Sequence, residues 1–346
     1  MFDKTLGRWL DATGPHADIV LSSRIRLARN VAGVNFPSRA LPADQERVID
    51  GVEGALQNLS IFAPDRFLRS KRLTPVQTGF LVERHLASLE FAAEGMSRAI
   101  FVGQDEMLSV MVNEEDHLRL QTISSGLDFG PALKEVQSLD EVLGAGLGYA
   151  FSGQYGFLTA CPTNLGTGMR ASVLIHLPGL ALTREIEKIL RGALQVGLAV
   201  RGLYGEGSET RGNLFQISNQ VTLGKSEEEI VEVLTRIATD VVGFERKARD
   251  YLLEKLRLEI EDKVLRADAV LRAARVLTGD EATNLLGVLR LGVTTGLIPS
   301  PSTRLINELM ILCRPANLQV YHDQELTPPE RDAVRAELVR ARLATA

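Results

Sequence analysis

The chain has 346 residues, which predicts two domains, or one large domain with an appendage, at roughly 100–200 residues per domain. Hydrophobic residues make up 45% and charged residues 24%, so a disordered or fibrous chain is excluded. The net charge of −5 argues against a general binder of nucleic acid or of anionic membranes. Cys161 and Cys313 are too few for a disulfide framework or a cysteine-based zinc site. Since we find no signal peptide or membrane span, the expected compartment is the cytoplasm.

The first 225 residues mix strands and helices, beginning with the part up to about residue 125. Thr74 and Pro75 fit the N-cap and first position of a helix, which we expect to carry His85. The last strand of this part alternates Arg119 and Gln121 with apolar residues, so one of its faces is polar. The patterns predict an extended segment, two helices and three strands at residues 18–30, 43–59, from 74, 99–102, 108–113 and 117–124.

The second half becomes progressively more helical. Ser226 and Glu229 form a capping box, and helical periodicity follows to about Leu277, with Gly243 as the one expected interruption of the helix. We therefore expect a mixed catalytic domain over residues 1–249, with its core from about residue 21, and a helical domain over 250–346. Other expected elements are a helix at 131–143, strand-like residues 149–161, a helix at 183–200, a strand within 200–224, and helices starting after Thr278 and Thr327.

Arginine dominates the basic residues, with 31 Arg against 8 Lys. Five arginines lie on short polar segments next to Gly-rich or acidic residues. If these segments converge, the guanidinium groups form a cage suited to a polyanion such as a triphosphate, in place of a P-loop. The alternative is that they are scattered, ion-paired surface residues. The five are Arg24, Arg26, Arg119, Arg170 and Arg201.

Three glutamates come from the same segments, namely Glu114, Glu115 and Glu206. Carboxylates facing a cationic cage suit an acceptor that is itself a guanidinium. Its pKa of about 12.5–13.8 puts the neutral nucleophile about six units out of reach at pH 7, or roughly 8 kcal/mol. A carboxylate can take the proton as the N–P bond forms while a second holds the planar group in line. The alternative for residues 113–116 is a solvated acidic turn.

Cys161 precedes Pro162 in the Gly-rich segment CPTNLGTGMR. Composition favours a buried structural thiol. A thiolate near Arg170 would be stabilised, so a contact with the substrate stays open as the second interpretation.

Taken together, the segments SSRIR, NEEDHLR, CPTNLGTGMR and RGLYGE resemble those of the phosphagen (guanidino) kinases, and more closely the bacterial protein-arginine kinases of the McsB type. The resemblance covers nearly the whole chain. It implies an α+β fold, with a curved antiparallel sheet flanked by helices as in the glutamine-synthetase catalytic core, and an all-helical C-terminal domain. It also implies transfer of the ATP γ-phosphoryl group to a guanidinium nitrogen, with Mg²⁺ held mainly by the phosphates and no metal ligands from the protein.

The resemblance assigns roles by position. Glu115 is the catalytic base, Glu206 the second carboxylate on the guanidinium, Glu114 a neighbour in the same cluster, and Cys161 a contact to the acceptor. The ATP-binding residues that it implies are Ser22, Ser23, Arg24, Ile25, Arg26, His85, Arg119, Arg170, Ala171, Ser172, Val173, Leu174, Arg201, Gly202, Leu203, Tyr204, Gly205 and Glu206.

Only 21 residues precede Ser22, which leaves room for a bulky acceptor such as an arginine on a protein. The family also implies marking of proteins for Clp-type degradation, a role in stress response, a homodimer, and as partners a zinc-binding activator protein and a Clp-type unfoldase. Two other hypotheses are a free-arginine kinase and a phosphoarginine-binding adaptor with weak catalysis. An allosteric phosphoarginine pocket is implied by the motif RDAVRA, at Arg331, Asp332, Arg335 and Ala336, for which a surface ion-pair ladder is the alternative.

Overall fold

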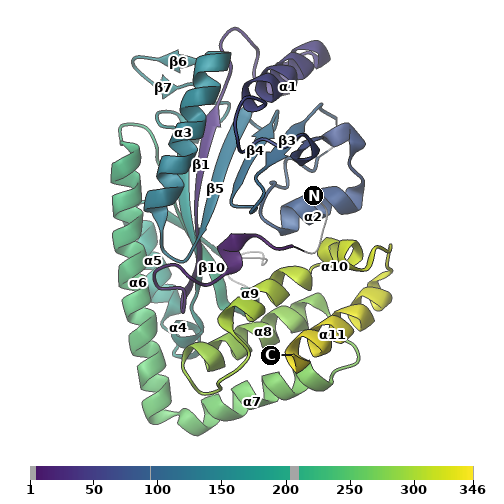
Figure 1. The fold of residues 1–346 in the computed structure, drawn as a ribbon. Coiled ribbons are helices and arrows are strands. Elements are labelled where there is room, and N and C mark those ends of the chain that lie inside the picture. The colour runs from purple at the N-terminus through teal and green to yellow at the C-terminus, as the bar shows by residue number, and fades with distance from the viewer. Residues whose placement is uncertain (1–4, 94, 203–209, 346) are drawn as a thin grey trace.

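A computed structural model describes residues 5–93, 95–202 and 210–345. Its centre is an eight-stranded sheet in the order β2-β3-β4-β5-β1-β8-β10-β9, and every neighbouring pair is antiparallel (Figure 1). A two-stranded β6–β7 ribbon stands apart from it. The strands are β1 (Val20–Arg29), β2 (Phe67–Arg69), β3 (Ala99–Val102), β4 (Leu108–Val112), β5 (Leu118–Ser125), β6 (Phe151–Ser152), β7 (Gly156–Phe157), β8 (Met169–His176), β9 (Leu198–Gly202) and β10 (Leu214–Asn219).

Helices flank this sheet, and a group of helices follows it at the C-terminal end (Figure 1). The expected α+β fold with a helical C-terminal part is thereby confirmed. The helices are α1 (Pro42–Leu56), α2 (Pro75–Glu83), α3 (Phe129–Leu147), α4 (Pro178–Leu182), α5 (Ile186–Gln195), α6 (Glu227–Lys255), α7 (Arg257–Ala273), α8 (Gly279–Thr294), α9 (Thr303–Leu312), α10 (Pro315–His322) and α11 (Pro328–Ala344), besides short 3-10 turns.

One face of the sheet forms the main core. Ile25 and Leu27 of β1 point into it and are fully buried among side chains of α1, α3 and α6. Because successive residues of a strand point to opposite faces, Arg24 and Arg26 between them point to the other face. The alternation in the sequence thus assigns one face to packing and leaves the other for polar side chains.

A second core joins the sheet to the C-terminal helices: Leu21, Leu174 and Leu214 of the strands pack with buried side chains of α7, α8, α9 and α11, among them Leu286, Leu309 and Val339. The N-terminal segment, with the 3-10 turn η1 (Arg8–Leu10), passes between these helices and the sheet (Figure 1). Arg290 of α8 donates to the carbonyl oxygens of Ala17 and Asp18, at 2.7 and 3.0 Å. This buried arginine therefore fastens the segment to the helices.

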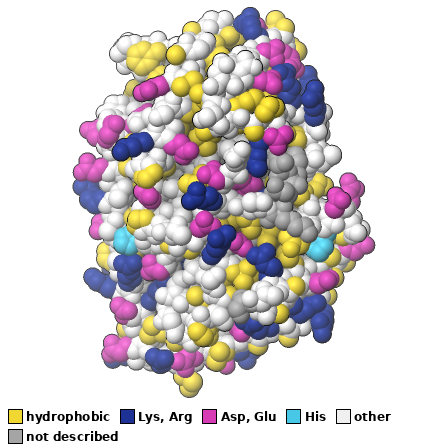
Figure 2. All heavy atoms as spheres, viewed as in Figure 1, with side chains coloured by type: hydrophobic (Ala, Val, Ile, Leu, Met, Phe, Trp, Pro, Cys, Tyr) yellow, Lys and Arg dark blue, Asp and Glu magenta, His cyan; other side chains and the backbone are white. Residues whose placement is uncertain are grey.

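Charge is mixed over the surface. On the face shown in Figure 2, acidic and basic side chains are interspersed rather than separated into one-sign areas. No helix in the described ranges is long and apolar enough to cross a membrane.

Several sequence predictions need correction. The helix after Ser226 is not interrupted at Gly243, which lies inside α6; the chain breaks at Leu256 instead, between α6 and α7. Residue 249 also lies inside α6, so the expected domain boundary stays a prediction. The strand at 149–161 is reduced to the two short strands β6 and β7, and the helix at 183–200 ends at Gln195, because β9 begins at Leu198.

Candidate active site

The polar face of the sheet lines a cleft of about 780 Å³. All five predicted arginines reach it, from the adjacent strands β5, β1 and β8 and from β9, which is separated from β8 by β10. Arg26 of β1 is directly opposite Arg170 of β8, so their side chains share that face. The lining includes Arg24, Arg26, Arg119, Arg170 and Arg201, with Glu114, Glu115 and Cys161. The interpretation of these arginines as scattered surface residues is therefore wrong.

Like charges crowd this cleft. Burial lowers the pKa of Arg26 well below its usual value, and the neighbouring Arg24, Arg119 and Arg170 lower it further. Burial and the nearby Arg201 and Arg119 also lower the pKa of Arg170. The Nε atoms of Arg26 and Arg170 are buried without a hydrogen-bond acceptor among the described residues. An anion with several oxygens would supply the missing acceptors and relieve the repulsion.

The two adjacent glutamates of the acidic turn differ sharply in environment. Glu114 is only 2% exposed; its carboxylate lies 2.7 Å from Arg119 Nη1 and accepts a hydrogen bond from Ser88 Oγ. Burial raises the pKa of Glu114, against the opposing effect of Arg119. The Glu115 side chain is 43% exposed, 3.3 Å from Arg119 Nη2. Glu115 is therefore placed to meet a substrate, while Glu114 orients the arginine.

The acidic turn is held by buried polar residues, so it is not the solvated turn that the sequence left as an alternative. Asp116 is fully buried, and its Oδ1 accepts from Asn30 Nδ2 and from the backbone N–H of Ala160, both at 2.7 Å. One oxygen thus joins the turn that carries Glu115 to the loop that carries Cys161. Sequence reasoning passed over this residue, although it lies inside the NEEDHLR segment.

Cys161 lines the cleft and is half-buried. Its Sγ lies 3.0 Å from Thr163 Oγ1, and its carbonyl oxygen accepts from Thr159 Oγ1 at 2.8 Å. The interpretation as a buried structural thiol applies instead to Cys313, which is 3% exposed and whose pKa burial raises to about 12.

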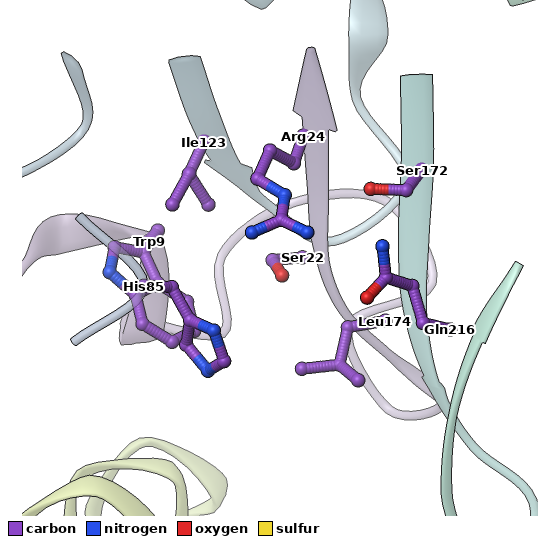
Figure 3. Close-up of a pocket in the computed structure, with 8 residues that line it drawn as sticks. All are labelled: Trp9, Ser22, Arg24, His85, Ile123, Ser172, Leu174 and Gln216. Carbon is purple, nitrogen blue, oxygen red and sulfur yellow. The ribbon is translucent and has the colours of Figure 1, made fainter. Parts of the chain in front are cut away.

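A second, smaller pocket of about 20 Å³ opens beside the cleft (Figure 3). His85 reaches it from just beyond the end of α2, with a φ of 60°, rather than from within the helix as expected. Burial lowers the pKa of His85 to about 3, helped by Arg24 and Arg314, so its ring is neutral near pH 7. The residues around the pocket are Trp9, Ser22, Arg24, His85, Ile123, Ser172, Leu174 and Gln216.

Four of the predicted ATP-binding residues face away from both pockets. Ile25, Ala171 and Val173 belong to the main core, and Ser23 Oγ donates to the Gly126 carbonyl at 2.8 Å on that same side. Only their backbone atoms are near the cleft face. Gly202 is the last residue of β9, and the predicted residues Leu203, Tyr204, Gly205 and Glu206 lie outside the described residues.

The C-terminal motif is divided between core and surface. Arg335 is 2% exposed and donates to the carbonyl oxygens of Cys313 and Leu277 and to Asp332, at 2.7, 2.6 and 2.5 Å. Ala336 is fully buried. Arg331 is half-buried and donates to the Leu326 carbonyl at 3.2 Å. The surface ion-pair ladder is therefore a poor description of Arg335, whose bonds are internal.

The comparisons with known proteins agree with this geometry. The model of the ATP:guanido phosphotransferase C-terminal catalytic domain matches residues 47–248, more than half of the chain, and that of the protein-arginine kinase McsB C-terminal domain matches residues 257–346. A protein-arginine kinase of Symbiobacterium thermophilum is 48% identical over 97% of this chain and 96% of its own length. The chain belongs to this family. One from Moorella thermoacetica is 46% identical over 97% of each chain.

Solved structures of the wider family share the fold. A duplicated taurocyamine kinase from Schistosoma mansoni with bound transition-state-analogue components has a TM-score of 0.60 and 27% identity over 68% of this chain. The match spans about a third of that longer protein, 34%. A lombricine kinase has a TM-score of 0.58 and 25% identity, over 71% of this chain and 70% of its own.

Proposed function

We propose that this chain is a protein-arginine kinase that transfers the γ-phosphoryl group of ATP to arginine side chains of proteins. The observation that carries the proposal is the arginine cage, with two buried Nε donors left unpaired among the described residues, facing an exposed glutamate across one cleft. The protein-arginine kinases that are 44–48% identical to the chain support the choice of acceptor.

In this proposal the triphosphate lies against the five arginines, and the acceptor guanidinium lies between Glu115 and Cys161. The N–P bond forms as the bond from the γ-phosphorus to the β,γ-bridging oxygen breaks, and ADP leaves. The proton of the attacking nitrogen passes to Glu115. Glu206 would be the second carboxylate on the acceptor. The arginines spread the charge that develops on the transferring group.

Mg²⁺ would enter with ATP, bound to the phosphate oxygens, where it neutralises charge on the nucleotide. Within the described ranges, no group of three or more His, Cys, Asp or Glu side chains is arranged to hold a metal ion. The guanidinium donors of the cleft suit phosphate oxygens rather than a cation. In this proposal the protein holds the nucleotide and the phosphates hold the metal ion.

The cleft favours a protein acceptor over free arginine. The cleft of about 780 Å³ has room for an arginine that remains attached to a polypeptide. A free-arginine kinase is the second candidate.

The remaining family properties are part of the same proposal. We expect residues 1–249 to form the catalytic domain and 250–346 the helical one, in a homodimeric, cytoplasmic protein with a zinc-binding activator and a Clp-type unfoldase as partners. The proteins that it phosphorylates would be marked for degradation during stress. In the phosphoarginine pocket, Arg331 would contact the ligand, since the guanidinium of Arg335 is engaged by the protein itself.

The test is incubation with ATP, Mg²⁺ and an unfolded protein, followed by mass spectrometry under non-acidic conditions. We expect an acid-labile phosphoryl group on arginine, and none with Glu115→Gln. Consumption of free arginine without modification of protein would favour the free-arginine kinase instead.

A test of the C-terminal pocket uses Arg331→Ala, because Arg335→Ala would also remove internal hydrogen bonds. We expect the rate to stop responding to added phosphoarginine. A response equal to that of the unaltered protein would remove Arg331 from the pocket.

A further inference from the structure

Trp9 precedes every motif of the catalytic cleft, yet its ring borders the small pocket beside that cleft (Figure 3). The pocket adjoins the cleft, since Arg24 and Gln216 line both. A triphosphate bound to the arginine cage therefore points its other end, the nucleoside, toward this pocket. The inference that follows rests on the proposed use of ATP.

The walls of the pocket suit a flat, uncharged ring. Trp9 and His85 meet edge to face, with ring centroids 5.6 Å apart and planes at 79°. Ile123 and Leu174 add apolar walls. Figure 3 places the two rings on one side of Arg24 and Leu174 with Gln216 on the other. Aromatic faces of this kind bind nucleobases by stacking, whatever the base.

The pocket is too small for a base as it stands. A space of about 20 Å³ holds about one water molecule. Ser22, Arg24, Ser172, Leu174 and Gln216 belong to strands that are hydrogen-bonded on both sides within the sheet. Trp9 and His85 come from segments outside these strands, so they are the walls that a base can displace.

Trp9 is also attached to the C-terminal helices. It packs with Ile311 of α9 in a small buried cluster, and the next residue, Leu10, accepts a hydrogen bond at its carbonyl from Asn307 of the same helix at 3.2 Å. A displacement of the indole is therefore transmitted to α9.

We propose that Trp9 binds the nucleobase of ATP with its ring, and that α9 holds the indole in position to do so. Trp9 is then a nucleotide-binding residue that lies outside the strands of the cleft, and Ile311 is a positioning residue.

The chain contains a single tryptophan, so its intrinsic fluorescence reports on this pocket alone. We expect ATP to change the emission in a saturable way. Inorganic tripolyphosphate, which offers the arginine cage a chain of phosphates without a base, should compete with ATP but leave the emission nearly unchanged. Emission that does not respond to ATP would overturn the proposal.

Kinetics of two variants provide the second test. Trp9→Leu should raise the KM for ATP roughly fivefold or more, the loss expected for one stacked base, with a smaller change in kcat. Trp9→Phe keeps an aromatic face, so its KM for ATP should lie between those of the unaltered protein and of Trp9→Leu. The inhibition constant of tripolyphosphate should stay the same in both variants. Equal weakening of ATP and tripolyphosphate would mean that Trp9 only supports the fold.

Two buried isoleucines of helix α9, Ile311 and Ile306, provide a test variant and its matched control. Ile311→Ala should raise the KM for ATP without changing the inhibition by tripolyphosphate. Ile306→Ala shortens a buried isoleucine of the same helix that belongs to a different cluster, and should leave both constants unaltered. Equal KM values for the two variants would refute the role of Ile311.

The two levels of the proposal fail in different ways. If the unaltered protein neither bound ATP nor phosphorylated arginine, the proposed function would be wrong, and this inference with it. If it did both while the Trp9 variants kept the same KM for ATP, only this inference would be wrong.

Discussion

Two neighbouring glutamates of the cleft are distinguished by burial rather than by sequence. Glu114 is buried and paired with Arg119, whereas Glu115 stands in the open part of the cleft. A buried ion pair stabilises only while both partners are present, and an exposed one contributes little.

Stability measurements should separate these two residues. Glu114→Ala leaves the guanidinium of Arg119 without its buried partner and should lower the free energy of unfolding by about 3 kcal/mol. Glu115→Ala should lower it by less than about 1 kcal/mol. Urea unfolding of both variants provides the comparison, and equal losses would contradict the assignment of Glu114 to a supporting role.

The effect on turnover should be the opposite of the effect on stability: a conservative change of Glu115 should lower kcat strongly. Glu115→Gln keeps the shape of the side chain but cannot accept the proton, so we expect kcat to fall about 10²- to 10⁴-fold with little change in unfolding. Initial rates at saturating ATP measure this. A kcat within twofold of that of the unaltered protein would exclude Glu115 as the base.

Spacing explains why Arg24 and Arg26, two apart on one strand, share a face, but the convergence of Arg119, Arg170 and Arg201 from other strands was only a condition of the prediction. The same alternation explains why Ser23 and Ile25 fail to join the arginine cage: consecutive residues cannot share a face of a strand. Trp9 and Asp116 were missed for a different reason. Their importance comes from partners such as Ile311 and Ala160, far away in the chain, which no local pattern indicates.

At the scale of helices, glycine was a poor guide to where a helix ends. Gly243 lies within α6, a helix of 29 residues, and a Cβ at that position would meet open space. Packing of Leu234, Ala238 and Val242 against the sheet outweighs the weak helix preference of one glycine. The break comes at Leu256, a residue whose type does not mark a helix end.

Two glycine substitutions test this distinction. Gly243→Ala should stabilise the protein by about 0.5–1 kcal/mol through helix preference alone. Gly287→Ala, in α8, should destabilise it by about 1–3 kcal/mol, since its Cβ would lie 2.7 Å from the Gly212 carbonyl oxygen. Thermal or urea unfolding measures both, and a gain at Gly287 would mean that α8 approaches the 3-10 turn at Arg211–Asn213 less closely.

For the whole molecule, periodicity predicted a mixed N-terminal part and a helical C-terminal part, whereas the antiparallel sheet flanked by helices was implied by the resemblance to the guanidino kinases. Neither could predict how the two parts are joined. The joint includes the shared hydrophobic cluster and Arg290, a fully buried arginine with a pKa lowered to about 9 by burial, which donates to carbonyl oxygens of the N-terminal segment. Such a contact links residues more than 270 positions apart.

Two fully buried histidines make the fold sensitive to acid. Burial lowers the pKa of His117 and, together with Arg290 and Arg249, that of His176 well below the usual 6.5. As the pH falls below 6.5 the unfolded chain binds protons that the folded protein does not, so stability decreases. We expect a loss of about 1–3 kcal/mol between pH 7.5 and 5.5 from these two groups.

Urea unfolding at several pH values tests this expectation. His176→Asn should reduce the slope between pH 7.5 and 5.5. A free energy of unfolding that stays constant over that range would show that the two imidazoles bind protons in the folded state as readily as in the unfolded chain.

One carboxylate oxygen of Asp116 anchors both the acidic turn and the thiol loop. Glu115 and Cys161, the two groups that would contact an acceptor, are therefore positioned by the same carboxylate oxygen. We expect a compound attached covalently to Cys161 to strain the hydrogen bond between Ala160 and Asp116, which would shift Glu115 as well as block the entrance of the cleft. Thiol-directed inhibitors would then impair this protein twice, and the second impairment would persist even for adducts small enough to leave the entrance open.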